Sequence, residues 1–180
     1  MDAPEGCRSL AVFVVINRAE AVRQWVSYAA FAAQLRNSSR TARTQVEGTM
    51  NAFVSMDIER FKAGLADDVV SFEMDLENKP VRFGSRNEVV RWAEATFAEL
   101  KKMGASLKLD IHSSNCRATS TLAYCTVEFD LKATMTDGST MSQPSRNSVV
   151  LRNGEDGWKW AHWHSSPAVP PAPPASPAQK

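Results

Sequence analysis

The sequence lacks long apolar runs, an excess of one charge and the common catalytic or nucleotide-binding motifs. Its longest apolar run, Leu10 to Ile16, is seven residues long, whereas a membrane-spanning helix needs about 20. The 21 basic and 20 acidic residues nearly cancel, so a groove that follows nucleic-acid phosphates is not expected. There is no GxGxxG, GxxxxGK(S/T), GxSxG or HExxH motif, which excludes the usual dinucleotide, nucleotide, serine-hydrolase and zinc-protease sites. We therefore expect a soluble domain with neither a nucleic-acid nor a membrane partner.

Cysteine is also scarce, which bears on the compartment. Cys7, Cys116 and Cys125 show no CxxC spacing, and any bridge between two of them leaves the third unpaired. We expect free thiols in a reducing compartment, and therefore a cytoplasmic protein, rather than a disulfide framework or a cysteine-rich zinc module. The alternative is an organelle transit peptide, because every cation between Cys7 and Arg43 is arginine and Glu20 is the only acid there.

The composition divides the chain into three parts. Residues 1–40 form an accessory segment with an amphipathic helix predicted over residues 18–36. Residues 41–166 form the main domain, which begins with a helix of its own. From residue 167 onward the chain holds six of its nine prolines, and proline lacks the amide donor that helices and sheets use, so residues 167–180 are predicted to be a disordered tail.

Within the main domain the hydrophobic period changes from helical to alternating. Ser85 and Glu88 form a capping box that opens a helix, and Gly104 is placed to close it. Beyond Gly104 apolar and polar residues alternate, most clearly from Ala123 to Lys132, as in a strand with one buried face. The order helix, helix, strand, helix and about four strands predicts an α+β domain with helices on one face of a curved antiparallel sheet.

Four strings in this order resemble the SnoaL-like branch of the nuclear transport factor 2-like superfamily, which includes ketosteroid isomerases and polyketide cyclases. The strings are Asp57–Phe61, Leu65–Val70, Val81–Gly84 and Asp156–Ser166. The resemblance implies a cone-shaped sheet with about three helices on its concave face, to which the N-terminal segment adds an extra helix. It also implies a homodimer that forms through the sheet, here through the face that carries Tyr124, Thr126, Glu128, Asp130 and Lys132.

The resemblance further implies a general base at the end of the first strand, a position that falls on Glu73. Apolar surroundings raise the pKa of a carboxyl toward neutrality, which suits proton transfer from carbon. The hydrogen-bond donors of the isomerases fall at Thr49 and at Val149 or Val150, so steroid isomerisation by their mechanism is not expected. The residues expected to line the pocket are Phe53, Trp92, Phe97, Phe129 and Trp160.

The closing strand holds two of the three histidines. In a regular strand alternate side chains share a face, so Trp158, Trp160, His162 and His164 are predicted to point the same way. Imidazole acts as an acid or a base near pH 7, which makes His162 and His164 candidate catalytic groups; hydrogen bonding to a neighbouring strand or a subunit contact is the alternative. The spacing supplies no third metal ligand, so neither a metal nor a cofactor is predicted.

These observations predict an apolar cavity that binds a small hydrophobic molecule. If the protein is an enzyme, we expect isomerase, cyclase or dehydratase chemistry by proton transfer, with Glu73 as base and His162 or His164 as acid or orienting group. The alternative is a non-catalytic dimerisation or protein-interaction module of the same fold, because this fold supports unrelated functions. An enzyme needs an open cavity that Glu73 reaches, whereas an assembly module can fill it with side chains.

Overall fold

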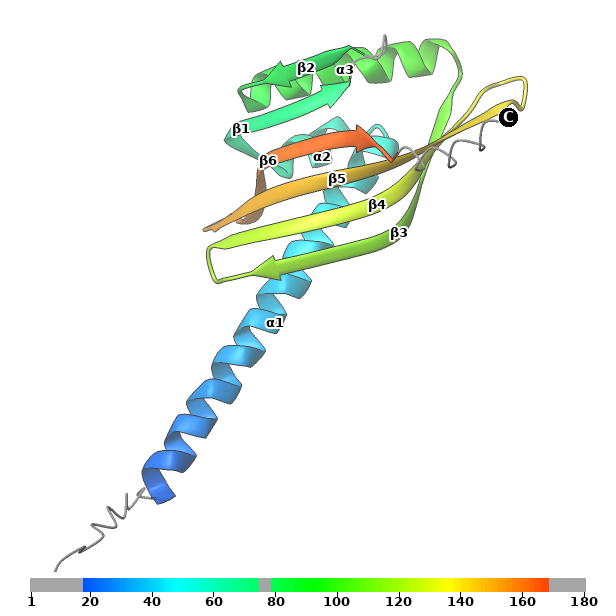
Figure 1. Ribbon diagram of the computed structural model, residues 1–180. Coiled ribbons are helices and arrows are strands. Elements are labelled where there is room, and N and C mark those ends of the chain that lie inside the picture. Colours follow the sequence, from blue (N-terminus) through cyan, green and yellow to red (C-terminus); the bar gives the residue numbers. More distant parts are fainter. Residues whose placement is uncertain (1–17, 75–78, 169–180) are drawn as a thin grey trace, which may run out of the picture. The chain divides into compact units, whose positions relative to one another are not determined.

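The computed structural model describes residues 18–74 and 79–168 (Figure 1). Contacts within the chain divide it into two compact units, Met1–Ala33 and Gln34–Lys180. The described part of the first unit is helical, and the description below concerns the second. Residues 1–17 of the predicted accessory segment and residues 169–180 of the predicted tail lie outside the described residues. No described helix is both long and apolar enough to cross a lipid bilayer.

Helix α1 runs without a break from Arg18 to Val54. The prediction of an accessory helix over residues 18–36 followed by a separate domain helix therefore missed that the two are continuous. The segment contains no proline and a single glycine, Gly48, so nothing in it interrupts the helical hydrogen bonds. Ala42 and Val46 are fully buried, which shows that the second half of α1 belongs to the core of the second unit.

Local capping residues set the ends of the two shorter helices. Helix α2 spans Ile58–Ala63, and the Asp57 side chain accepts a hydrogen bond from the Arg60 amide at 3.0 Å. Helix α3 spans Arg86–Lys102, where Ser85 Oγ accepts from the Glu88 amide at 3.4 Å. The serine half of the predicted capping box is confirmed, whereas the Glu88 carboxylate accepts from the Gly84 amide at 2.7 Å instead of from the Ser85 amide. The closing glycine is confirmed, since Gly104 follows α3 with φ of 64°.

Six strands form one curved sheet in the order β2-β1-β6-β5-β4-β3. Their bounds are Leu65–Met74 for β1, Pro80–Phe83 for β2, Ser106–Ala118 for β3, Leu122–Thr134 for β4, Thr140–Gly154 for β5 and Gly157–Pro167 for β6. The predicted α+β class with a curved sheet is confirmed. The predicted sheet was antiparallel throughout, but the sheet is mixed because β1 pairs in parallel with β6. The last strand thus lies beside the first. Residues 167 and 168 were predicted to belong to the tail, but Pro167 pairs with Ser145 and the Ala168 amide donates to the Pro144 carbonyl at 2.8 Å.

A bulge in β6 changes which of its side chains face the helices. Leu151 pairs with Trp160 but Val150 pairs with His162, so Ala161 is an extra residue in the ladder. An extra residue shifts the alternation by one position, which sends every later side chain to the opposite face. The prediction that the tryptophans and histidines of β6 share one face is therefore wrong beyond Ala161.

Two of the three cysteines are joined across the β3–β4 hairpin. Cys116 and Cys125 lie directly opposite each other in register, with 4.1 Å between their Cα atoms, and form a disulfide. The prediction of free thiols is wrong for this pair. The spacing of nine residues matches no motif, and only the strand register places the two sulfur atoms together. Cys7 lies outside the described residues.

Candidate functional site

A cavity of about 330 Å³ lies between the helices and the concave face of the sheet. Side chains of all three helices and of every strand except β2 surround it, and most are apolar. This volume is at the lower end of the range of pockets that hold small organic ligands. Its polar and ionisable lining residues are Glu73, Thr96, Gln143, Ser145, Asn147, Ser165 and Ser166, together with the indole groups of Trp92, Trp160 and Trp163.

Glu73, near the end of β1, is the single acidic or basic side chain among the described residues that line this cavity. Its Oε1 accepts hydrogen bonds from Trp163 Nε1 and from Ser165 Oγ, the latter at 2.8 Å. Both donors contact the same oxygen. The carboxyl is thus held in one orientation, and Oε2 has no hydrogen-bond partner among the described residues.

Burial raises the pKa of the Glu73 carboxyl from about 4.5 to about 7, because the charged form loses hydration. The hydrogen bond from Ser165 acts in the opposite direction and stabilises the carboxylate. A pKa near 7 leaves comparable amounts of acid and base at neutral pH, which is the condition for efficient proton transfer in both directions.

Aromatic rings form the cavity wall. Phe53 of α1 stacks on Trp92 of α3, with 5.5 Å between ring centroids, and Trp160 meets Trp163 edge-on at 5.2 Å. Of the predicted lining residues, Phe53, Trp92, Phe129 and Trp160 do line the cavity. Phe97 is not among the lining residues; it is buried behind Phe53, with 5.1 Å between their ring centroids.

Two buried polar groups beside the cavity lack partners. Trp160 is 3% exposed and its Nε1 donates to no atom in the described structure, while Asn147 is 6% exposed and its Oδ1 accepts no hydrogen bond there. Unpaired buried polar atoms cost free energy and are rare in native proteins. In the wall of a pocket such atoms can pair with a bound molecule or with water.

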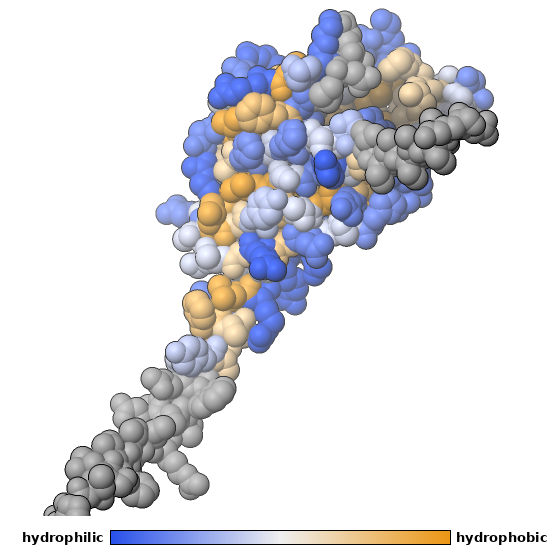
Figure 2. Space-filling model, in the orientation of Figure 1, coloured by the Kyte–Doolittle hydropathy of each residue, from blue (hydrophilic) through white to orange (hydrophobic). Residues whose placement is uncertain are grey.

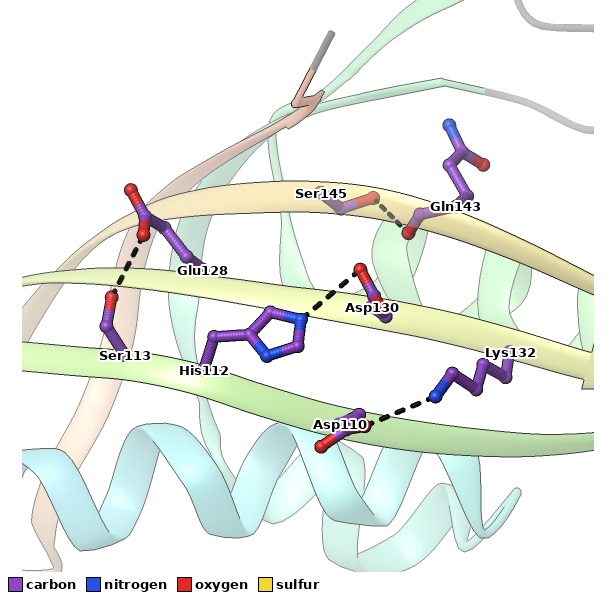
Figure 3. Close-up of polar contacts among 8 residues, drawn as sticks. All are labelled: Asp110, His112, Ser113, Glu128, Asp130, Lys132, Gln143 and Ser145. Atoms are coloured by element: carbon purple, nitrogen blue, oxygen red, sulfur yellow. Dashed lines mark hydrogen bonds and ion pairs between the residues drawn. The ribbon is translucent and has the colours of Figure 1, made fainter. Parts of the chain in front are cut away.

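None of the three histidines lines the cavity. After the bulge, His162 and His164 take the outward side of β6, where the imidazole of His162 meets the ring of Phe72 at 5.8 Å. Neither lines the cavity. His112 is on β3, where Nε2 lies 3.3 Å from Asp130 Oδ1 (Figure 3). The described residues contain no group of three or more metal-ligating side chains.

Sequence reasoning missed three members of the site. Trp163 and Ser165 follow the bulge, and a regular alternation assigns them to the outer face. Asn147 sits in a polar stretch of β5 and gives no signal in the sequence. The isomerase donor position at Thr49 is occupied by a buried hydroxyl that donates to the Gln45 carbonyl at 3.0 Å and does not line the cavity.

Polar contacts between strands occupy the outer face of the sheet (Figure 3). Lys132 lies 3.2 Å from Asp110, and Ser113 donates to Glu128 at 3.3 Å. On the face of the molecule that Figure 2 shows, hydrophobic residues are interspersed among hydrophilic ones. The face on which we expected a dimer contact thus already pairs much of its charge within the subunit.

Comparison with known proteins gives one match to a family model. Residues 43–170 match the model of the SnoaL-like domain. Comparison with proteins of curated function found no match.

Several solved structures share this fold. A proposed dehydratase of the NTF2-like family from Streptomyces avermitilis has a TM-score of 0.65 and 15% identity, over 76% of this chain and 99% of that one. A ketosteroid isomerase-like protein from Erwinia carotovora atroseptica has a TM-score of 0.55 and 16% identity, over 73% and 97%. A CaMKII hub from S. rosetta has a TM-score of 0.57 and 18% identity, over 72% and 96%. At such low sequence identities the likeness establishes the fold but not the reaction, which has to be argued from the residues of the cavity.

Proposed function

Because this chain belongs to the SnoaL-like domain family, whose fold encloses a cavity here, we propose that it binds a small apolar molecule there and catalyses proton transfer on it. The observation that carries the proposal is Glu73, the one ionisable side chain of the described cavity lining, with its pKa raised to about 7. The similar proteins described as a dehydratase and as ketosteroid isomerase-like fit this class of chemistry.

The proposed step needs no cofactor. As a carboxylate, Glu73 removes a proton from a carbon next to a carbonyl group; as the resulting carboxylic acid, it returns the proton to another carbon or to a leaving hydroxyl. The first outcome is an isomerisation and the second a dehydration, and neither changes the oxidation state of the protein. Trp160 Nε1, which is unpaired beside the cavity, is the donor that we propose for the substrate oxygen, where negative charge develops.

Ser165 and Trp163 have a positioning role in this scheme. Both donate to Oε1 of Glu73, which fixes the plane of the carboxyl and leaves Oε2 for the substrate proton. An oriented base avoids the loss of rate that accompanies a freely rotating one.

The test is carbon-acid exchange in deuterated water. Steroid ketones, aromatic polyketides and long-chain 3-keto esters are first screened by thermal shift, and the ligands found are followed by NMR for incorporation of deuterium beside the carbonyl. Glu73→Gln keeps the shape and a hydrogen-bond acceptor but removes the base, so we expect exchange to fall at least about 100-fold while binding remains.

Glu94→Gln provides the matched control, because it makes the same change at an exposed position of α3 away from the cavity. We expect it to exchange at the rate of the unaltered protein. Equal exchange in Glu73→Gln and Glu94→Gln would refute the role of Glu73.

A second candidate function, a non-catalytic dimerisation module, is favoured by one row of the outer face. Tyr124, Val150, His162 and Val70 lie side by side across four strands, and Tyr124 is 50% exposed. Such a row offers apolar and aromatic surface to a second copy. Light scattering at micromolar concentration would give twice 19.8 kDa for a dimer of the unaltered protein and 19.8 kDa for Tyr124→Asp. A mass of 19.8 kDa for the unaltered protein would exclude this candidate.

A further inference from the structure

A second depression, of about 400 Å³, lies between α1 and β3 and shares no residue with the cavity. Helix α1 contributes Leu35, Arg36, Ser39, Arg40 and Arg43 to this groove, and β3 contributes Ser114, Asn115 and Cys116. Both parts belong to the unit Gln34–Lys180. The groove carries three guanidinium groups, and none of its described lining residues is acidic.

Two long-range hydrogen bonds hold this stretch of α1 in place. Ser39 Oγ accepts from the Ala118 amide at 3.1 Å, and Trp158 Nε1 donates to Thr41 Oγ1 at 3.0 Å. Together with the burial of Ala42, they fix the helix face that carries the arginines. The groove is therefore a preformed feature of the fold.

The arginines form one stripe whose charge is not neutralised within the described chain. Positions 36, 40 and 43 follow the spacing that brings side chains together on one side of a helix. Arg40 donates to Asn37 Oδ1 at 2.9 Å. Arg36 and Arg43 have no hydrogen-bond or ion-pair partner among residues 18–74 and 79–168. Three neighbouring positive charges repel one another, and a bound anion relieves that repulsion.

The strand opposite adds hydrogen-bond donors. β3 is the last strand of the sheet, so one of its edges is unpaired. The short Cα separation of Cys116 and Cys125, 4.1 Å, marks a pair that exchanges no backbone hydrogen bonds, which leaves the Cys116 amide and, by alternation, that of Ser114 directed to the open edge. The Ala118 amide comes next in this alternation of residues 114, 116 and 118. It donates to Ser39 Oγ on α1, which supports the conclusion that these amides point to the open edge. Ser114 Oγ is also buried without a partner in the described structure.

We propose that this groove is a binding site for a phosphate group, either as inorganic phosphate or at the end of a small phosphate ester. Guanidinium groups match phosphate oxygens with paired hydrogen bonds, and the amides of Ser114 and Cys116 face them across the groove. A dianion with several oxygens satisfies three arginines better than a carboxylate, which has one charge and two oxygens. The site is independent of the cavity and of the chemistry proposed there.

The experiment is an NMR titration of the full ¹⁵N-labelled protein with inorganic phosphate and, separately, with phenyl phosphate, at constant ionic strength set with sodium chloride. We expect saturable shifts of the Ser114 and Cys116 amide signals. The double variant Arg36→Gln/Arg43→Gln should weaken binding at least tenfold, because two charge-assisted contacts are lost. Tighter binding of inorganic phosphate identifies the free ion as the ligand, and tighter binding of phenyl phosphate identifies an ester; both support the site.

Arg91→Gln/Lys101→Gln is the control, since it removes two positive charges from exposed positions of α3 outside the groove. We expect unchanged affinity. An equal loss of affinity in both double variants would mean diffuse attraction by net charge and would overturn the proposal. So would shifts that fail to saturate by about 10 mM phosphate, or that saturate without involving Ser114 and Cys116.

Discussion

The two sides of β6 show how different the surroundings of one strand can be. Its inward side brings Trp163 and Ser165 to the Glu73 carboxyl in an apolar cavity. Its outward side carries His162 and His164 on the outer face of the sheet, away from that cavity. The extra residue Ala161 separates these outcomes. The side of the strand on which a titratable side chain lies thus decides its surroundings: the half-buried carboxyl of Glu73 lines the cavity, whereas the imidazoles of His162 and His164 do not.

The largest expected contrast between the two sides is in stability. Trp163 is 2% exposed, so Trp163→Ala should lower the free energy of unfolding by about 3–5 kcal/mol through lost burial and the cavity left behind. His164→Ala, one residue along, should change it by less than about 0.5 kcal/mol, as at other surface positions. Urea denaturation measures both. Similar losses in the two variants would mean that the inward and outward assignments are not as described.

The pH dependence of stability comes next in size. Because the pKa of Glu73 is raised on folding, from about 4.5 to about 7, the native state holds this proton more tightly than the unfolded state. The stabilisation is complete below about pH 4.5 and is lost as the pH rises to about 7, a change of up to about 3 kcal/mol.

Glu73→Gln removes this titration without removing the acceptor for Ser165. Its free energy of unfolding, relative to the unaltered protein, should therefore rise between pH 4.5 and pH 7 and level off above. Denaturant titrations at pH 5, 6, 7 and 8 measure the difference. A difference that is independent of pH would show that Glu73 titrates in the native state as it does in the unfolded chain.

The smallest effect tests the positioning of the carboxyl. Ser165→Ala removes the hydrogen bond that lowers the pKa of Glu73, so the pKa should rise above 7, by up to about one unit. Ser166→Ala, whose hydroxyl accepts from Arg146 Nε instead, should leave that pKa where it is. The ¹³C signal of the Glu73 carboxyl, followed against pH, reports both. A rise in both variants would indicate a general change in the cavity rather than loss of one bond.

What could be predicted from the sequence was local or periodic. The capping box depends on Ser85 and Glu88, which are three residues apart, and the alternation of buried and exposed side chains in β4 depends on residues two apart. Both can therefore be recognised from the sequence without knowledge of the fold. The predicted fold class follows from such signals in sequence order, and the predicted family rests on the resemblance of four short strings. Glu73 and four of the five expected lining aromatics occupy the cavity wall, whereas the chemical role of Glu73 stays a prediction.

What escaped prediction depends on register between distant strands. The bulge at Ala161 has no glycine or proline to mark it, and it reversed the expected orientation of His162 and His164. The disulfide requires Cys116 to lie opposite Cys125, which a count of residues does not specify. The partners of Glu73 are 90 and 92 residues away, beyond the reach of any local pattern.

The parallel pairing of β1 with β6 also has a consequence for the order of folding. Strands β3, β4 and β5 follow one another and pair as neighbours, so their contacts join segments that are close in the sequence and can form early. β1 pairs in parallel with β6, the last strand of the sheet in sequence order, and contacts of such sequence separation form slowly. One edge of β1 therefore stays unpaired until β6 has packed against it, and the wall around Glu73 is complete only when Trp163 and Ser165 have reached its carboxyl.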